Sequence, residues 1–322
     1  MLRLVLVALL AVLVSPIKAE TWPSRPLTMV VPFAAGGPMD AVARILQSAL
    51  SDALQEQVIV ENVGGAGGMI GAARVAKSAP DGYQFVLGNV GTHAVSQTLY
   101  ATPFYSSTAD FAPVILVAEL SLVMVARKDL PANNLREFIA YAKANQKTMQ
   151  FASAGAGSAT HLGCALINAR LGIDVTHVPY RGGALAMQDL IAQRVDYLCI
   201  DTPTALPQIE SGAIKPIAIL SHGRSPSLPN LASAHEQGLT DFEASNWSAF
   251  FLPKDTPAFI VQRLHDAGVA AMNDPAVQKR FGENGIDLVA DERRSSAYLA
   301  QFVTSEITKW AGPIKATGAT AD

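Results

Sequence analysis

The chain has 322 residues, of which 50% are hydrophobic and 16% are charged, so it is long and apolar enough for two ordinary domains with full cores. Its formal net charge of −3 at pH 7 argues against a nucleic-acid-binding surface and against a basic membrane-binding patch. Cys164 and Cys199 are too few for a disulfide scaffold, and because both lie in apolar stretches we expect two buried thiols rather than a bridge.

The first predicted element is a targeting segment at residues 1–19. Arg3 precedes an uncharged apolar run, residues 4–14, and Ala19 is a small residue suited to cleavage after it. The run is too short for a membrane span, which needs about 20 residues. We therefore expect export and removal of this segment, which takes away Arg3 and Lys18 and lowers the net charge from −3 to −5.

The next segment predicts a strand, a glycine turn and a helix. Residues 27–31 form a β-branched apolar run, and apolar residues then recur at helical spacing. Gly36 and Gly37 permit close approach of a ligand to the backbone, and Pro38 suits the first position of a helix. Such a helix start offers free N–H groups and a partial positive charge to a carboxylate or phosphate. We interpret Asp40 in its first turn as a capping residue rather than a ligand contact.

A second strand at residues 57–62 leads into a glycine-rich turn. The spacing of Gly65, Gly67 and Gly71 is one residue longer than the dinucleotide fingerprint, and it follows the second strand instead of the first. No acidic residue closes the next strand, residues 84–89, as a ribose contact would require. Nucleotide binding is therefore not favoured.

Polar residues follow this third strand at its carboxyl end, where open α/β sheets bind ligands. Asn89 and Thr92 either donate hydrogen bonds to a ligand or serve the turn itself. His93 has no partner at metal-ligand spacing, so we interpret it as an ordinary hydrogen-bonded histidine.

The middle of the chain predicts a change of domain and a second α/β series. Strands at residues 113–119 and 122–126 lead into the charged connection 127–131, which is the first candidate crossover between domains. A helix at 135–144 precedes a series that mirrors the first one. Its strands and helices are expected at residues 149–152, 158–171, 175–178, 184–191, 197–200 and 214–220.

The turns of this second series repeat the polar features of the first. Ser158 stands at the expected N-cap after residues 153–157 and creates a second helix start suited to an anion. Residues 180–183 and Asp201 follow later strands. Ser158, His161 and Asp201 are residue types that a hydrolase uses, but no Gly-x-Ser-x-Gly elbow surrounds Ser158, and an ordinary capped helix has the same pattern. No His-x-x-x-His or Cys-x-x-Cys group predicts a metal site.

Beyond the second series, the chain is expected to return to the first domain along residues 247–253. Helices at 258–272, 276–281 and 295–310 would then cover the sheet of that domain. Their apolar residues recur on one side, as packing against a sheet requires.

Motifs along most of the chain, from Trp22 to near the C-terminus, resemble those of one family in the right order. The chain is similar to the tripartite tricarboxylate transporter substrate-binding proteins, also called Bug proteins. The motifs that carry the resemblance are Val31–Asp40, Val60–Asn62 with Gly65–Gly68, Ala79–Tyr83, Pro179–Gly183, and Trp247 with Phe250–Pro253.

The resemblance implies an α/β fold of the type II periplasmic binding protein class, with two Rossmann-like domains joined by two crossovers (a Venus flytrap). We expect domain 1 at residues 20–125 and 248–322 and domain 2 at 126–247. The implied function is that of a monomeric periplasmic receptor, without enzymatic activity, cofactor, metal or nucleic acid. It would bind a di- or tricarboxylate, an amino acid or an aromatic acid between the domains and deliver it to a membrane permease. Alternatives are a ligand-sensing subunit of a membrane signalling partner and, less favoured, a secreted hydrolase that uses Ser158.

In that family the ligand carboxylate is held mainly by backbone amides and ordered waters from the loop after the first strand of each domain. The residues at which the resemblance places ligand contacts are Phe33, Ala34, Ala35, Gly36, Gly37, Asn89, Thr92, Ala154, Gly155, Ser158, His161, Tyr180, Arg181, Gly182, Gly183 and Asp201.

Overall fold

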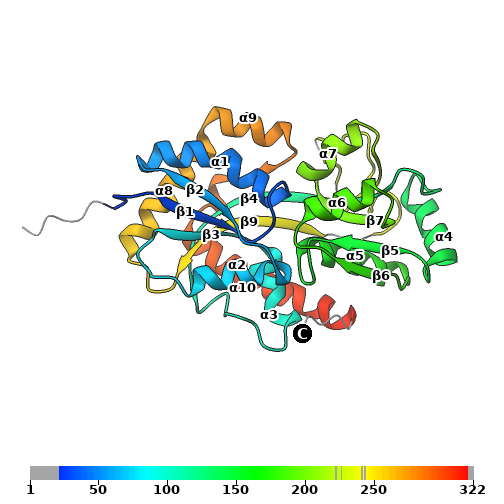
Figure 1. Cartoon of the computed structure of the whole chain (residues 1–322), viewed down its shortest axis with the longest axis horizontal. Coiled ribbons are helices and arrows are strands. Elements are labelled where there is room, and N and C mark those ends of the chain that lie inside the picture. The colour runs from blue at the N-terminus through cyan, green and yellow to red at the C-terminus, as the bar shows by residue number, and fades with distance from the viewer. Residues whose placement is uncertain (1–21, 222, 226, 241, 243, 318–322) are drawn as a thin grey trace, which may run out of the picture.

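Two α/β lobes lie side by side in the computed structural model, and one long strand belongs to the sheets of both (Figure 1). The structure describes residues 22–317 except 222, 226, 241 and 243, so the targeting segment expected at residues 1–19 lies outside the described residues. The shared strand is β4 (Phe111–Arg127). Strand β9 (Ser245–Pro253) runs antiparallel to it in the sheet of the first lobe.

The first lobe is a twisted sheet with the strand order β2-β1-β3-β9-β4. Its parallel part explains the continuous apolar run predicted as the first strand, because both faces of a parallel sheet are covered. Leu27, Met29, Val30 and Val31 are accordingly fully buried. The remaining strands of this lobe are β1 (Leu27–Val31), β2 (Val58–Asn62), β3 (Gln84–Asn89) and the short β10 (Asp287–Leu288), which pairs with β4.

Helices cover both faces of this sheet, and the three predicted near the C-terminus are among them. Trp247 in β9 shows how closely the last helix packs, because its indole N–H donates to the Glu306 carboxylate over 3.0 Å. In Figure 1, α1 and α9 lie above the sheet, whereas α2, α3 and α10 lie below it. The helices are α1 (Pro38–Leu54), α2 (Met69–Ala76), α3 (Ser96–Leu99), α8 (Ala258–Asn273), α9 (Pro275–Glu283) and α10 (Ser296–Thr317).

The second lobe repeats the order of the first, as the mirrored series in the sequence predicts. Its strands run β6-β5-β7 in parallel and continue with β4, and β8 pairs with β4 as well. The strands are β5 (Gln150–Ser153), β6 (Thr176–Pro179), β7 (Tyr197–Asp201) and β8 (Ile214–Ile219). The helices are α4 (Leu135–Asn145), α5 (Ala159–Leu171), α6 (Gly183–Ile191) and α7 (Thr202–Glu210).

Strand β4 corrects two predictions about the middle of the chain. The two strands expected there are one continuous strand, which pairs with β9 as far as Ser121 and with β7 from Leu122 onward. Its register shifts near Pro113 and again beyond it, which is how the strand accommodates a residue that breaks the sheet ladder. Residues 127–131 therefore follow a strand that has already crossed between the lobes. The domain boundaries at 125/126 and 247/248 stay predictions.

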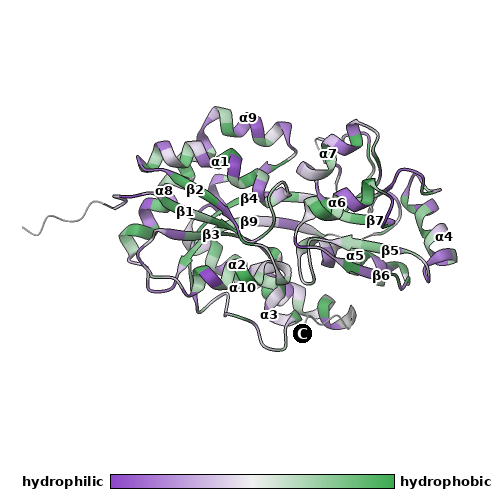
Figure 2. Ribbon diagram, in the orientation of Figure 1, coloured by the Kyte–Doolittle hydropathy of each residue, from purple (hydrophilic) through white to green (hydrophobic). Residues whose placement is uncertain are grey.

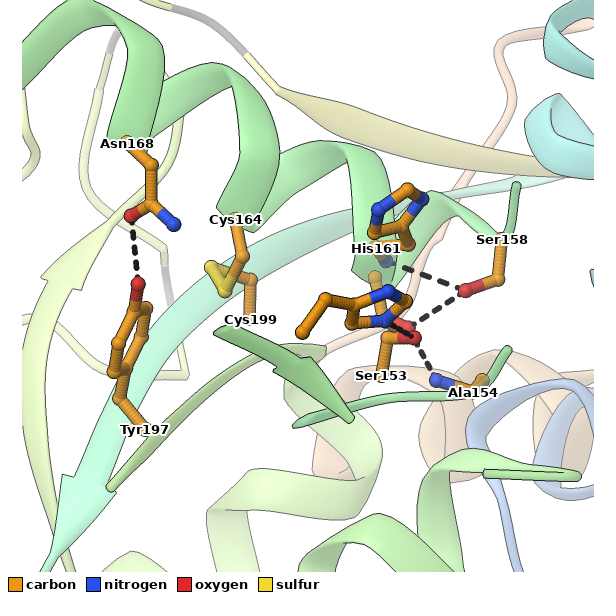
Figure 3. The surroundings of a disulfide bond; sticks show 10 residues. Ser153, Ala154, Ser158, His161, Cys164, Asn168, Tyr197 and Cys199 are labelled. Carbon is orange, nitrogen blue, oxygen red and sulfur yellow. Dashed lines mark hydrogen bonds between the residues drawn. A yellow bond between two sulfur atoms is a disulfide. The ribbon is translucent and has the colours of Figure 1, made fainter. Parts of the chain in front are cut away.

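The expectation of two separate thiols is wrong. Cys164 in α5 and Cys199 in β7 form a disulfide, with their Cα atoms 5.4 Å apart (Figure 3). Helix α5 packs directly on β7, so two cysteines that are 35 positions apart in the sequence become neighbours in the second lobe. Spacing alone carries no information on this contact.

Hydropathy follows the layers of the fold. In Figure 2 the central strands are largely hydrophobic, whereas the helices alternate between hydrophobic and hydrophilic residues. Among the described residues, no helix combines the length and the apolar character that a membrane crossing demands.

Removal of the disulfide tests its contribution to stability. The double variant Cys164→Ala/Cys199→Ala should lose about 2–4 kcal/mol in free energy of unfolding, because the unfolded chain regains the freedom that the cross-link removes. Guanidinium unfolding of the mature chain measures this change. A reducing agent should lower the midpoint of the native chain and leave that of the double variant unchanged, and a native chain insensitive to the reducing agent would contradict the bond.

Candidate functional site

A small cavity lies between the lobes, where helix starts and strand ends from both of them meet. The empty space within it is about 270 Å³, including the part open to solvent. Four helices begin here, α1 at Pro38 in the first lobe and α5 at Ala159, α6 at Gly183 and α7 at Thr202 in the second. The residues that line the cavity are Phe33, Pro38, Met39, Asn89, Ala154, Ser158, Ala159, Thr160, Gly183, Asp201 and Asn246.

The backbones of the two lobes touch beside this cavity. The Ala34 N–H donates to the Arg181 carbonyl over 3.3 Å, which joins the loop after β1 to the loop after β6. A Cβ atom at Gly182 would lie 2.8 Å from the Ala34 Cβ, and one at Gly67 would lie 2.1 Å from the Ala156 carbonyl oxygen. These two glycines therefore let the two lobes approach each other.

Asp40 fixes the loop that precedes α1. Its buried carboxylate accepts from the Gly36 N–H over 2.9 Å and from the Asn62 side chain over 3.0 Å, and it pairs with Arg44. Burial raises its pKa, but the hydrogen bonds from Arg44, Gly36 and Asn62 outweigh burial and hold the pKa below its ordinary value. The carboxylate thus folds back onto Gly36, one residue before the N-cap Gly37, so it fixes the loop instead of capping the helix, and Arg44 balances its charge.

The loop before α5 is held by its own hydroxyl groups (Figure 3). The Ser158 hydroxyl donates to the Gly155 carbonyl over 2.7 Å and accepts from the His161 N–H over 3.2 Å, so Ser158 is the predicted N-cap. The Thr160 hydroxyl accepts from the Ala154 N–H over 2.8 Å. Ser158, Ala159 and Thr160 line the cavity beside these contacts.

His161 does not form a catalytic pair with Ser158. Its ring nitrogen Nδ1 accepts from the Gly157 N–H over 3.1 Å, and its ring stacks on His177 with the centroids 4.1 Å apart. Burial lowers its pKa to about 4, so the ring is neutral at pH 7. Within the described part of the chain, Asp201 bonds to Asn246 and not to this histidine, and no serine, histidine and aspartate form a triad.

Asn89 and Thr92 form most of their hydrogen bonds with each other. The Asn89 Oδ1 accepts from the Thr92 N–H over 3.0 Å, and the Thr92 hydroxyl accepts from the Asn89 N–H over 2.9 Å. Thr92 is fully buried and does not line the cavity, which favours its role in the turn. Asn89 does line it, and its Nδ2 group donates to no other described residue.

Asp201 and Asn246 form the floor of the site. Asn246 lies opposite Leu120 of β4, and Asp201 lies opposite Leu122 on the other edge of the same strand, so both occupy the same face of the sheet. The Asn246 Nδ2 donates to the Asp201 carboxylate over 2.9 Å. Burial raises the pKa of Asp201 to about 7, although this hydrogen bond acts in the opposite direction. The Asn246 Oδ1 is buried and has no partner among the described residues.

The structure separates the predicted site residues into three groups. Those at the cavity wall are Phe33, Asn89, Ala154, Ser158, Gly183 and Asp201. Those in the adjoining loops are Ala34, Ala35, Gly36, Gly37, Gly155 and Gly182. Those directed elsewhere are Thr92, His161, Tyr180, whose hydroxyl donates to Asp189 over 2.6 Å, and Arg181, whose side chain is exposed.

Sequence reasoning missed five residues of the cavity wall. Pro38, Met39, Ala159 and Thr160 belong to the first turns of α1 and α5, so the predicted helix starts could have located them. Asn246 precedes Trp247 at the beginning of the returning strand, and nothing in the local sequence marks it. Within the described ranges, no three His, Cys, Asp or Glu side chains are grouped as a metal site.

Comparisons of the sequence and of the fold with known proteins identify one family. The model of the tripartite tricarboxylate transporter receptor family matches residues 42–319. A UPF0065 protein from the TAR-I ttuE-ttuC' intergenic region of Agrobacterium vitis is 40% identical over 93% of this chain and 86% of its own. The periplasmic binding protein BugD superposes with a TM-score of 0.90 at 38% identity, over 93% of this chain and 99% of its own. MatC from Rhodopseudomonas palustris, solved with bound malate, gives 0.89 at 36% identity, over 91% and 100%. The two-lobed fold class predicted from the sequence is thereby confirmed.

The raised pKa of Asp201 predicts a pH-dependent stability difference. Between pH 4 and 7 the folded state keeps a proton that the unfolded state has already released, so folding weakens as the pH rises through this window. In Asp201→Asn this contribution is absent. The free energy of unfolding of the variant, relative to the native chain, should rise by on the order of 3 kcal/mol from pH 4 to pH 7 and stay level above it. Thermal unfolding across pH 4–8 measures this; a difference that does not vary with pH would contradict it.

Proposed function

This chain belongs to the tripartite tricarboxylate transporter receptor family, and on that basis we propose that it is a periplasmic receptor for one small carboxylated solute. The solute binds between the lobes, and the loaded receptor delivers it to a membrane permease. The mature receptor begins after residue 19 and acts as a monomer. MatC, whose fold is closely similar, holds malate in its structure.

The observation that carries this proposal is the pair of helix starts at the cavity. Helix α1 has 17 residues and α5 has 13, and residues of both first turns line the same small space. Each start contributes a partial positive charge and unpaired N–H groups, which together bind a carboxylate without a formal cation. Hydrogen bonds to a charged group are worth about 1.5–3 kcal/mol each, so a few amides suffice for tight binding.

The positions of the basic side chains and of Asp40 agree with carboxylate binding by backbone amides. No lysine or arginine is among the residues of the described chain that line the cavity. Arg181, the cation closest in the sequence to a cavity loop, exposes its side chain to solvent. Asp40, which would repel an anion at the start of α1, is paired with Arg44.

A ligand screen tests the proposed function directly. Mono-, di- and tricarboxylates, amino acids and aromatic acids are added to the mature chain, and its thermal unfolding is recorded. One compact carboxylated class should raise the melting temperature, because a ligand at 100 times its dissociation constant adds about 2.7 kcal/mol of stability. Uncharged analogues of the same size, such as amides, serve as the control. A chain that no carboxylate stabilises would contradict the proposal.

A wedge between the lobes tests closure. A Cβ atom at Gly91 would lie 3.0 Å from the Gly157 carbonyl oxygen and 3.1 Å from the Ala159 nitrogen, both in the opposite lobe. We expect Gly91→Leu to hold the lobes apart and weaken binding at least tenfold, or about 1.4 kcal/mol, while the lobes stay folded. Calorimetry gives the affinity, and small-angle scattering should show that ligand shrinks the native chain but not the variant.

Two variants serve as controls for the wedge. Gly282→Ala adds a Cβ where no atom lies within 4 Å, so its affinity should equal that of the native chain. Arg181→Met removes the exposed cation beside the cleft and should cost no more than about tenfold. If Arg181→Met loses binding and Gly91→Leu keeps it, an arginine clamp replaces the helix amides as the carboxylate site.

A further inference from the structure

We propose that Asp201 and Asn246 form a subsite for a ligand ammonium group, so that this receptor selects carboxylates carrying an amine over those without one. The inference rests on the proposed function and names the chemical class of its ligand. It is carried by two hydrogen-bond acceptors at the floor of the cavity, one of which has no partner.

The positions of the two side chains follow from the sheet. Asp201 is the last residue of β7, and Asn246 is the second residue of β9, so they come to the same face from opposite edges of β4. Both are almost fully buried, with exposed fractions of 1% each. Both also line the cavity, so they belong to the wall that a ligand between the lobes would meet.

The hydrogen bond between them sets which atoms are offered to the ligand. Because the Asn246 Nδ2 donates to the Asp201 carboxylate, its Oδ1 is the free end of the amide. A buried acceptor without a partner is unfavourable, so the site is complete only when a donor occupies it. The amides at the starts of α1 and α5 are themselves donors, and they are matched to a carboxylate instead.

Charge distinguishes an ammonium group from other donors. Asp201 is the only residue with an ionisable side chain in the cavity wall as described, and no cation there balances it. A ligand that brought only negative charge would face this carboxylate in a site of low dielectric. An ammonium group has three N–H donors and can serve the Asp201 carboxylate and the Asn246 Oδ1 together, whereas a hydroxyl group has one donor and no charge.

An alternative arrangement, in which a protonated Asp201 contacts a ligand carboxylate, predicts a different proton exchange on binding. If Asp201 were protonated and donated to a ligand carboxylate, binding would take up a proton, since burial raises its pKa to about 7. An ammonium group beside Asp201 stabilises the ionised form, lowers that pKa and releases a proton on binding. The number of protons exchanged at pH 7 therefore differs in sign between the two arrangements.

Matched ligand pairs test the subsite on the unmodified mature chain. Aspartate, malate and succinate share one carbon skeleton and differ only in an amine, a hydroxyl or a hydrogen. Glutamate with glutarate and phenylalanine with 3-phenylpropionate extend the comparison to other lengths. In whichever series binds, calorimetry should give the amine-bearing member at least tenfold tighter than the member without a donor, with malate between aspartate and succinate. Titrations in buffers of different ionisation enthalpy should show proton release.

Two variants locate the effect. In Asp201→Asn the tenfold preference for the amine should fall to within threefold, while Asp52→Asn, the same change at an exposed aspartate on α1, should leave it intact. If Asp201→Asn does not fold, the affinities of the ligand series and the number of protons exchanged by the native chain still test the ammonium subsite.

The outcomes separate this inference from the function on which it rests. Equal or tighter binding of the acid without an amine, or proton uptake on binding, overturns the ammonium subsite and leaves the carboxylate receptor standing. Absence of binding by every acid in the series contradicts both the receptor and its subsite.

Discussion

Strand β4 hydrogen-bonds to β9 in one lobe and to β7 and β8 in the other, and this shared strand sets the positions of Asp201 and Asn246 at the floor of the cavity. Because β4 is continuous, the two sheets meet where its partner changes between Ser121 and Leu122. The floor of the cavity lies at that change, with Asn246 opposite one side of it and Asp201 opposite the other. A hinge motion that opens the lobes must therefore pivot close to these two residues.

Binding by backbone amides has a structural condition that this chain meets with small residues. The loops before these two helix starts each contact a glycine of the opposite lobe. A Cβ atom at Gly182 would lie 2.8 Å from the Ala34 Cβ before α1, and one at Gly67 would lie 2.1 Å from the Ala156 carbonyl oxygen before α5. A larger side chain at either position would push the lobes apart beside the proposed carboxylate site.

Local features of the site could be predicted from the sequence, whereas contacts between distant segments could not. The strand, turn and helix around Pro38 and the N-cap at Ser158 follow from short-range rules, and both were located correctly. The disulfide and the role of Asn246 depend on which strands become neighbours. The sequence predicts two strands here, ending at Glu119 and beginning at Leu122, whereas the structure has one strand that exchanges its partner between Ser121 and Leu122.

The disulfide joins α5 to β7 in the second lobe. Cys164 lies six positions after Ser158, the N-cap of α5, and Cys199 lies two positions before Asp201 on β7, so one covalent bond joins the elements that carry the proposed carboxylate site and the proposed ammonium subsite. The distance between these two proposed sites is then nearly independent of lobe closure. Under the proposed binding mode, a ligand that carries both a carboxylate and a donor meets a preformed half-site in this lobe. Because the second lobe is already ordered, binding of the ligand loses little free energy in ordering that lobe. Most of the binding free energy is then available to close the first lobe onto the ligand.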